Sequence, residues 1–302
     1  MAAFLFRRIL QSIPVFIGIV LICFALLKLA GDPVNMIASP RASAAERERI
    51  RENLGLNKPW YEQLGKYFVL DLGTSYREHI PVRDMLVARA AVTVRIAFSA
   101  TLLAVVLGLF SGLISAYRPR TIFAYSSAVA SSVGVSIPAF YLAMILILTF
   151  SIWLKWLPIP RPEADWKYLI IPILTLGLLN TAVLARLTRN CMLEELSENY
   201  VRSARGKGRT PLGTMLGHAF PNILVPVTTV IGTDLAGLLG GAVLTETACS
   251  IPGLGTLILQ GIHNRDHPVI IGACLFFAFA FVTVNLIVDL FYGVLDPRIR
   301  QS

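Results

Sequence analysis

Residues 96–117, IAFSATLLAVVLGLFSGLISAY, contain no charged side chain. A helix needs about 20 mostly apolar residues to cross a hydrocarbon core about 30 Å thick, and this stretch has the required length. The composition of the whole chain agrees, because 55% of its 302 residues are hydrophobic and only 15% are charged, whereas soluble domains carry about 25% charged residues. The sequence therefore predicts an all-α integral membrane protein and argues against a soluble enzyme.

Five further apolar runs accompany this stretch, so we expect about six transmembrane helices. The runs cover residues 9–29, 122–153, 168–187, 223–244 and 269–295. The run at 122–153 is long for one span, contains Pro138, and is rich in small residues in its first half. We interpret it as a single tilted or kinked helix that is buried among others. The first run is about 20 residues long and no small-residue cleavage site follows it, so we expect a retained span rather than a signal peptide.

Basic residues are concentrated in four short segments between or beside the apolar runs. These are Arg7 with Arg8, Arg118 with Arg120, residues 186–209, and Arg298 with Arg300. With six spans all four segments fall on one side, and short basic loops face the cytoplasm. We therefore predict cytoplasmic N- and C-termini. The net charge of +9 lies in these clusters rather than on one amphipathic face, so we do not expect a nucleic acid partner.

The span pattern divides the chain into three regions. Residues 1–30 hold the N-terminus and the first span, 31–95 form an extracytoplasmic segment, and 96–302 form a core of spans two to six. Within the outer segment, residues 42–54 predict a short polar helix that Gly55 and Pro59 end, and the rest predicts loops and short helices. The four cysteines form no CxxC pair, so their pattern supports neither a disulfide framework nor a zinc site, and we expect no bound metal.

The most informative polar segment is EELSENYVRSARGKGRTPLGTMLGHAFPNILVP, residues 194–226. It is too polar to span a membrane and too long for a simple turn, so we expect two short helices separated by Gly206, Gly208 and Pro211. Tyr200, Ala204 and Lys207 recur at helical spacing and would share one face of the first helix. Taken alone, the segment is equally well interpreted as an amphipathic loop that lies on anionic membrane lipid.

Several ordered motifs resemble one family over nearly the whole chain. YVRSARGKG, followed by a histidine, Asn222 and Pro226, resembles the cytoplasmic segment of ABC importer permeases, most closely their dipeptide/oligopeptide/nickel branch. Gly206 stands where that branch usually has alanine, and Pro221 where it often has arginine. The other matching stretches are FRRIL, LGLNKPWYEQ, LDLGTSYREHIPV, GGAVLTETACSIPGLG (240–255), NRDHPV (264–269) and NLIVDLFYGVLDPRIR (285–300).

The resemblance implies a type I ABC importer permease fold in the bacterial cytoplasmic (inner) membrane. In such importers two permease subunits form the pathway, and each inserts a cytoplasmic coupling helix into one of two ATPase subunits. The resemblance also implies a separate extracytoplasmic substrate-binding protein, and the branch suggests that the second permease is a paralogue, which gives a heterodimer. No GxxxxGK[ST] motif occurs in this chain, so we expect it to bind no cofactor and the partner ATPase to use ATP and Mg.

Carried onto this chain, the resemblance places a coupling segment at 190–222 and the coupling helix at about 199–209. It implies that Tyr200 is an aromatic anchor in the ATPase groove, with Ala204 on the same face. Arg202, Arg205 and Lys207 would pair with acceptors on the ATPase, and Gly208 would allow a sharp turn after the helix.

Two further places are candidate functional sites. Asp234 lies midway along the run 223–244, where the branch more often has a neutral polar residue. An ionisable residue at this depth is costly, so we weigh equally a pathway carboxylate that meets a cationic substrate group and a structural or protonated residue. Pro252, Gly253 and Gly255 predict a tight turn after that run. This turn would either line or cap the outer mouth of the pathway or form a short surface loop.

The leading hypothesis is therefore a permease half that imports short peptides by means of a separate ATPase. A nickel chelate, an opine or glutathione is the alternative substrate on the same scaffold. An intramembrane hydrolase would need a catalytic cluster at membrane depth, but no histidine lies within a predicted span. A secondary transporter is less favoured, because we find no inverted repeat and the polar segment would have no explanation.

Overall fold

The computed structural model describes residues 2–29, 34, 38, 41–163, 165–240 and 242–295. Over these residues it contains helices and no strand, apart from an isolated bridge between Thr74 and Pro81. The long helices are α1 (Ala2–Leu29), α5 (Val82–Tyr117), α8 (Trp166–Ser197), α11 (Phe220–Leu239) and α14 (His267–Leu295). The shorter ones are α3 (Ala44–Asn53), α4 (Trp60–Phe68), α6 (Ile122–Ser136), α7 (Ala139–Leu146), α9 (Asn199–Gly206), α10 (Pro211–Thr214), α12 (Val243–Ala248), α13 (Leu254–Asn264) and the π-helical η1 (Ile147–Trp153) and η2 (Met215–Ala219).

Within the described residues, four helical segments are long and apolar enough to cross a membrane. They are Val82–Tyr117, Trp166–Ser197, Pro211–Leu239 and His267–Tyr292, and they confirm the predicted second, fourth, fifth and sixth spans. The described part of α1 contains a shorter apolar helix, Leu10–Leu26. The polar helix predicted at 42–54 is also confirmed, since α3 covers Ala44–Asn53 with Ser43 as its N-cap.

The third predicted span is not a single kinked helix, and that expectation is wrong. The chain breaks between α6 and α7, and the segments Ile122–Ser136 and Ala139–Trp153 are bent by 110°. The cause is Pro138, because the residue before a proline is pushed out of helical geometry. Ile137 accordingly has φ −85° and ψ 125°. α6 is also not buried among other helices, because only Ala124 and Ser131 of its residues are buried.

Several helix boundaries differ from those that hydropathy predicts; α8, for example, ends at Ser197 rather than at 187. α5 begins at Val82 rather than near residue 96, because Pro81 starts the helix and Asp84 favours its positive N-terminal end. The segment just before residue 96, expected to consist of loops and short helices, is therefore part of a long helix. α11 ends at Leu239 rather than 244, and after Gly240 the chain continues into α12.

The central contact of the bundle is between α5 and α8. Small residues allow these helices to approach closely, as at Gly112, where an added Cβ would lie 2.7 Å from Thr188 Cβ. Membrane helices associate through such close packing because lipid provides no hydrophobic driving force between them. α14 packs against α11 and α1, and α1 in turn packs mainly on α14.

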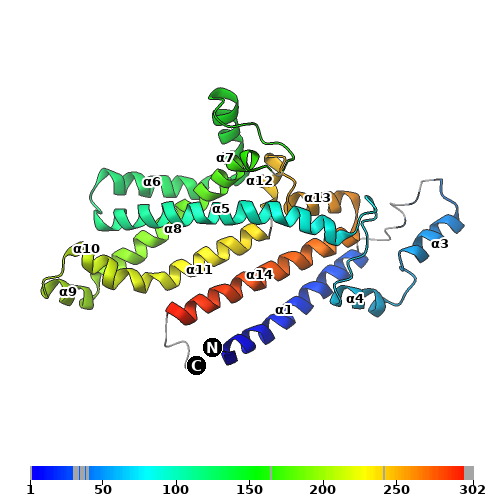
Figure 1. Ribbon diagram of the computed structural model, residues 1–302, viewed down its shortest axis with the longest axis horizontal. Helices are drawn as coiled ribbons and strands as arrows, with labels where there is room; N and C mark the ends of the chain where they lie inside the picture. The colour runs from blue at the N-terminus through cyan, green and yellow to red at the C-terminus, as the bar shows by residue number, and fades with distance from the viewer. Residues whose placement is uncertain are drawn as a thin grey trace.

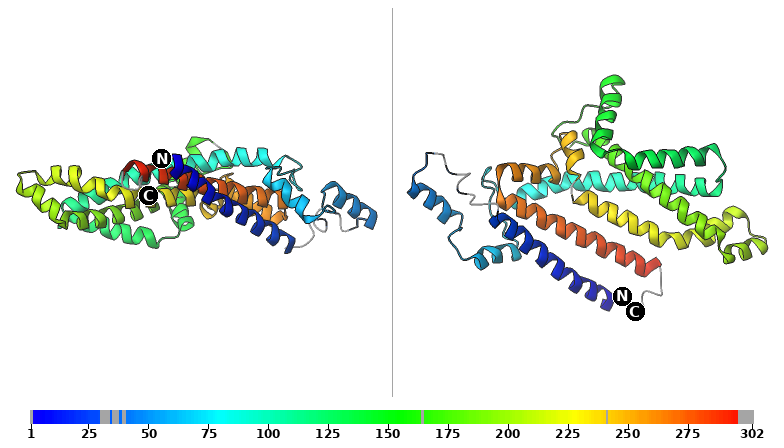
Figure 2. Two further views of the ribbon diagram at one scale, coloured as in Figure 1. Left: turned by 90° about the horizontal axis from the view of Figure 1, so that it is seen from below. Right: turned by 180° about the vertical axis from the view of Figure 1, so that it is seen from behind.

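The helices place their ends in two groups along the long axis of the molecule. α9 and α10, the end of α5, the start of α1 and the end of α14 lie toward one end, and α3, α4 and α13 lie toward the other (Figure 1). The two further views show the same arrangement (Figure 2). The predicted basic segments that the structure describes therefore share one end. Arg298 and Arg300 lie outside the described residues, and the cytoplasmic location of the termini stays a prediction.

Candidate functional site

α9 is a short amphipathic helix held against the end of the bundle. Val201 is fully buried and Ala204 is 7% exposed, whereas Arg202, Arg205 and Lys207 are exposed. Val201 packs in a cluster with Met192 of α8 and with Met215 and Ala219 of η2. The face formed by Val201 and Ala204 thus attaches α9 to its own chain, and the arginines and the lysine point outward as a basic surface.

The turn predicted after α9 is present. Gly208 has φ +84°, a conformation that only glycine adopts readily, and the chain then enters α10 at Pro211. The expected pair of short helices separated by Gly206, Gly208 and Pro211 is therefore confirmed. Of the residues predicted to share one face, Tyr200 and Lys207 are exposed while Ala204 is buried against the rest of the chain.

Tyr200 joins α9 to two long helices through hydrogen bonds. Its hydroxyl donates to Glu195 Oε2 of α8 and accepts from Asn222 Nδ2 of α11 at 2.9 Å. Burial, together with the hydrogen bond to Glu195, raises the pKa of Tyr200 to about 12, so the hydroxyl keeps its donating proton at neutral pH. Glu195 and Val201 were not predicted from the sequence, although the three-residue spacing of Val201 and Ala204 is typical of one helix face.

At the opposite end, Glu246 of α12 is a buried carboxylate surrounded by hydrogen-bond donors. Thr93 Oγ1 of α5 donates to its Oε1 at 2.7 Å, and the Thr256 amide donates to its Oε2 at 3.1 Å. Thr256 lies in the first turn of α13, whose N-cap, Gly253, has no side chain. Glu246, a residue of α12, therefore caps the N-terminus of α13 in place of a side chain at the N-cap position itself. Burial raises the pKa of the Glu246 carboxyl, and these hydrogen bonds oppose that shift.

The predicted turn residues form the cradle of this carboxylate. A Cβ added to Gly253 would lie 2.2 Å from Glu246 Oε1, and one added to Gly255 would lie 2.9 Å from Oε2. Both glycines are buried, and Pro252 is partly buried between them and Ile251. The tight turn is confirmed. The segment packs against α5, and its place at the outer mouth of a pathway stays a prediction.

A second carboxylate at this end joins two of the sequence motifs that the resemblance singled out. Asp266 is 3% exposed. It accepts hydrogen bonds from Ser75 Oγ at 2.5 Å and from the Tyr76 and Arg77 amides at 3.2 and 3.3 Å. The loop before α5 is thereby held against the start of α14, and the ring of Tyr76 contacts that of His267.

Replacing Asp266 by asparagine is expected to destabilise the fold by about 1–3 kcal/mol, because an amide NH₂ would then face backbone and hydroxyl donors. The measurement is the melting temperature of the purified chain in detergent. Asp165→Asn is the matched control, since Asp165 is exposed and its pair with Lys167 is the kind of surface ion pair that contributes little. Equal melting temperatures for the two variants would contradict the role of Asp266.

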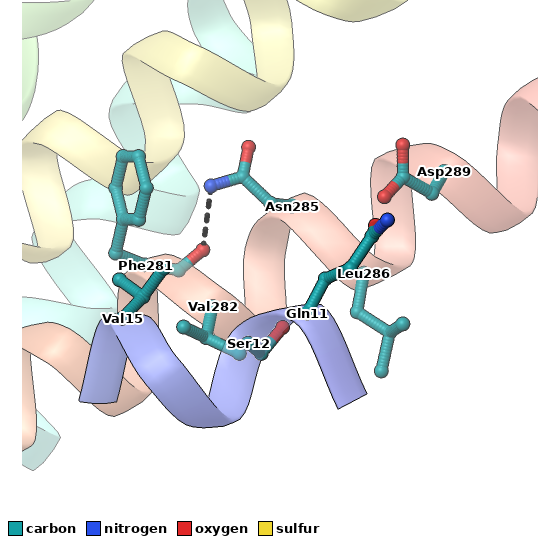
Figure 3. A pocket seen from close by; sticks show the side chains of 8 residues that line it. All are labelled: Gln11, Ser12, Val15, Phe281, Val282, Asn285, Leu286 and Asp289. Atoms are coloured by element: carbon teal, nitrogen blue, oxygen red, sulfur yellow. Dashed lines mark hydrogen bonds between the residues drawn. The ribbon is translucent and has the colours of Figure 1, made fainter. Parts of the chain in front are cut away.

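Asp234, the carboxylate predicted at membrane depth, does not line a cleft with the polar residues of α14. Asp234 lies partly buried in α11, and the described residues make no hydrogen bond or ion pair to its carboxylate. Asn285 and Asp289 of α14 instead line a cleft of about 220 Å³ beside α1, together with Gln11 and Ser12 (Figure 3). Asn285 Nδ2 donates to Phe281 O of its own helix at 3.0 Å. Within the described part of the chain no group of three or more histidine, cysteine or acidic residues could hold a metal.

Comparisons with known proteins cover the full chain. The model of the binding-protein-dependent transport system inner membrane component family matches residues 104–301. A putative peptide transport system permease of Brucella abortus (strain 2308) is 38% identical, with 100% of both chains aligned. The dipeptide transport system permease DppB of Alkalihalophilus pseudofirmus is 37% identical over 99% of this chain and 100% of its own. The glutathione transport system permease GsiC of Escherichia coli O6:H1 is 38% identical over 100% of both chains.

The fold also has a counterpart among solved structures. A chain of the methionine ABC transporter MetNI, in an inward-facing conformation, superposes with a TM-score of 0.60 at 19% identity over 72% of this chain and 98% of its own. That likeness confirms the type I importer permease fold. Because the family model matches most of the chain and full-length relatives are 37–38% identical to it, this chain belongs to the binding-protein-dependent transport system inner membrane components, the permease subunits of ABC importers.

Proposed function

We propose that this permease forms half of the translocation pathway for short peptides in an ATP-driven importer. The observation that carries the proposal is similarity over the full chain to permeases named for peptide and dipeptide transport. Membership of the family implies that this chain functions together with other ABC transporter subunits. The subunits proposed here are a second, paralogous permease, two ATPases and an extracytoplasmic binding protein. This chain binds no cofactor in the proposal, and the ATPases use ATP and Mg.

The proposed route of coupling runs through α9. Its outward residues Tyr200, Arg202, Arg205 and Lys207 enter the ATPase groove, where aromatic and arginine side chains contribute strongly to binding. Its inner face is packed on α8 and η2 through Val201, and Tyr200 is hydrogen-bonded to both α8 and α11. A displacement of α9 by the ATPase would therefore move two long helices together. Such a joint movement allows the pathway to switch between two conformations.

The outer end supplies a surface for the substrate-binding protein. α3 and α4 project beyond the bundle at the end opposite α9 (Figure 1). α3 is strongly polar, with the sequence AAERERIREN and no buried residue, so it needs no hydrophobic partner. The Ser75–Asp266 contact joins the loop before α5, which follows these helices in the chain, to α14. A binding protein docked on the outer segment would thus contact a region that is held to the membrane-spanning helices by this hydrogen bond.

Glutathione is a second candidate substrate, favoured by the 38% identity to the glutathione permease over both full chains. The test is uptake of labelled dipeptides, tripeptides and glutathione by cells that carry the complete transporter, compared with cells that lack this chain. Loss of peptide uptake supports the proposal. Loss of glutathione uptake alone would favour the second candidate, and no loss of either would contradict both.

Asp234 is proposed to face the pathway and to interact with cationic groups of the substrate. Asp234→Asn is then expected to lower uptake of lysine-containing peptides by roughly tenfold, which corresponds to about 1.4 kcal/mol, and to leave uptake of glutamate-containing peptides unchanged. Asn285→Ala is the control, because that side chain bonds the backbone of its own helix. Unchanged uptake of both peptide classes by Asp234→Asn would remove Asp234 from the pathway.

A further inference from the structure

Two of the four cysteines come together although they are far apart in the sequence. Cys23 lies in α1 and Cys274 lies in α14, two helices that pack on each other, and the two thiols are close enough to interact. The two helices run side by side in all three views (Figures 1 and 2). The pair was not evident from cysteine spacing, because nothing in the sequence places α1 next to the last span.

The packing around the pair holds α1 and α14 in register at the level of the two cysteines. Val20, one turn before Cys23, belongs to one buried cluster with Ile271 and Leu275, which flank Cys274. Val20 and Ile271 are 0% and 2% exposed, so the register of the two helices is set on both sides of the cysteines. Packed helices have axes about 8–10 Å apart, so facing residues bring their Cα atoms to within about 4–5 Å, which a disulfide can span.

The pair lies toward the predicted outer end of α1 and α14, beside α4. The same cluster contains Leu64 of α4, with Phe24 and Tyr67 packed against it. α4 is a nine-residue helix, too short to span, and Lys28 Nζ near the end of α1 donates to its Gln63 Oε1 at 2.8 Å. Because α4 belongs to the predicted extracytoplasmic segment, the thiols lie beside the compartment in which disulfides persist rather than in the reducing cytoplasm.

We propose that Cys23 and Cys274 are oxidised to a disulfide that fixes α1 to α14 at the outer face of the membrane. The oxidant is an external disulfide of the extracytoplasmic thiol-oxidase class. One cysteine thiolate attacks it and forms a mixed disulfide, releasing one thiol. The second cysteine attacks the mixed disulfide, forms the Cys23–Cys274 bond and releases the second thiol, so two protons and two electrons leave the pair. α1 packs mainly on α14, so this bond would join a peripheral helix covalently to the core.

The test counts reactive thiols in the full chain. Intact cells are lysed in denaturant containing a maleimide–polyethylene glycol, with or without prior reduction, and gel mobility reports the number of labelled cysteines. We expect two labels without reduction and four after it, since the chain has four cysteines. In a digest of the unlabelled, unreduced chain, mass spectrometry is expected to detect the two peptides that a Cys23–Cys274 disulfide joins.

Two conservative variants make the result specific. Cys23→Ser is expected to give three labels with or without reduction, whereas Cys191→Ser is expected to give one label without reduction and three after it. Four labels in unreduced wild-type chain would overturn the proposal, and so would a disulfide that joins Cys23 to another chain. Neither outcome depends on the transported substrate, so the proposed function is tested separately.

Discussion

Gly253→Ala is expected to destabilise the permease by about 2–4 kcal/mol and to reduce its amount in the membrane. The added Cβ would lie 2.2 Å from Glu246 Oε1 and 2.5 Å from Oε2. The carboxylate would have to move, and it would lose contact with Thr93 and with the start of α13. Overpacking a buried site costs about 1–3 kcal/mol, and leaving buried polar groups unpaired adds about 1–3 kcal/mol. The measurements are the melting temperature in detergent and the yield of folded chain.

The expected effect is steric, and two variants test that reason. Gly253 has φ −101° and ψ −173°, which is extended backbone that alanine also adopts. Gly237→Ala is the matched control, because an added Cβ there meets nothing within 4 Å. Glu246→Ala combined with Gly253→Ala should cost less than the sum of the single changes, since the carboxylate that clashes is absent. Strict additivity, or a Gly253→Ala chain as stable as wild type, would contradict the cradle.

The sequence predicts the spans well because hydropathy shows which residues are apolar enough to lie in the membrane. It predicts helix ends poorly because a helix can continue beyond the apolar region. Residues 82–95 contain Arg83, Arg89 and Arg95 and so do not resemble a span, yet they continue α5 as one helix. Pro138 was visible in the sequence, but whether a proline kinks a helix or ends it depends on whether neighbours satisfy the freed backbone groups.

The site residues that sequence reasoning missed depend on contacts between distant parts of the chain. Glu246 and its partner Thr93 are 153 residues apart, and Asp266 and Ser75 are 191 apart. A motif in a single sequence shows which residue types occur at which spacing. It does not show which of them contact each other in the folded chain. The helix α9 and its turn were predictable because they are local: the spacing, the glycine turn and the basic residues all lie within 199–209.

Arg205→Glu is expected to abolish stable binding of the ATPase and to reduce substrate uptake at least about 30-fold. Arg205 is exposed at the end of α9, and the proposed function places it against acceptors in the ATPase groove. A glutamate there would meet those same acceptors, and truncation or mispairing of a buried interfacial charge costs about 2–5 kcal/mol. The measurements are copurification of the ATPase with tagged permease and uptake of a labelled dipeptide in cells.

The structure allows this effect to be separated from misfolding. Arg205 is on the outward face of α9, whereas Val201, Glu195 and Asn222 hold the helix in place, so the melting temperature of Arg205→Glu should match that of wild type. Arg205→Lys keeps the charge and should retain most of the ATPase. Arg49→Glu reverses an equally exposed charge on α3, at the opposite end, and should leave ATPase binding unchanged. Arg202→Glu is a second charge reversal on the same face. If both variants retained the ATPase as well as wild type does, the basic face of α9 would not be the coupling surface, because binding in the groove would then not depend on the charge of either arginine.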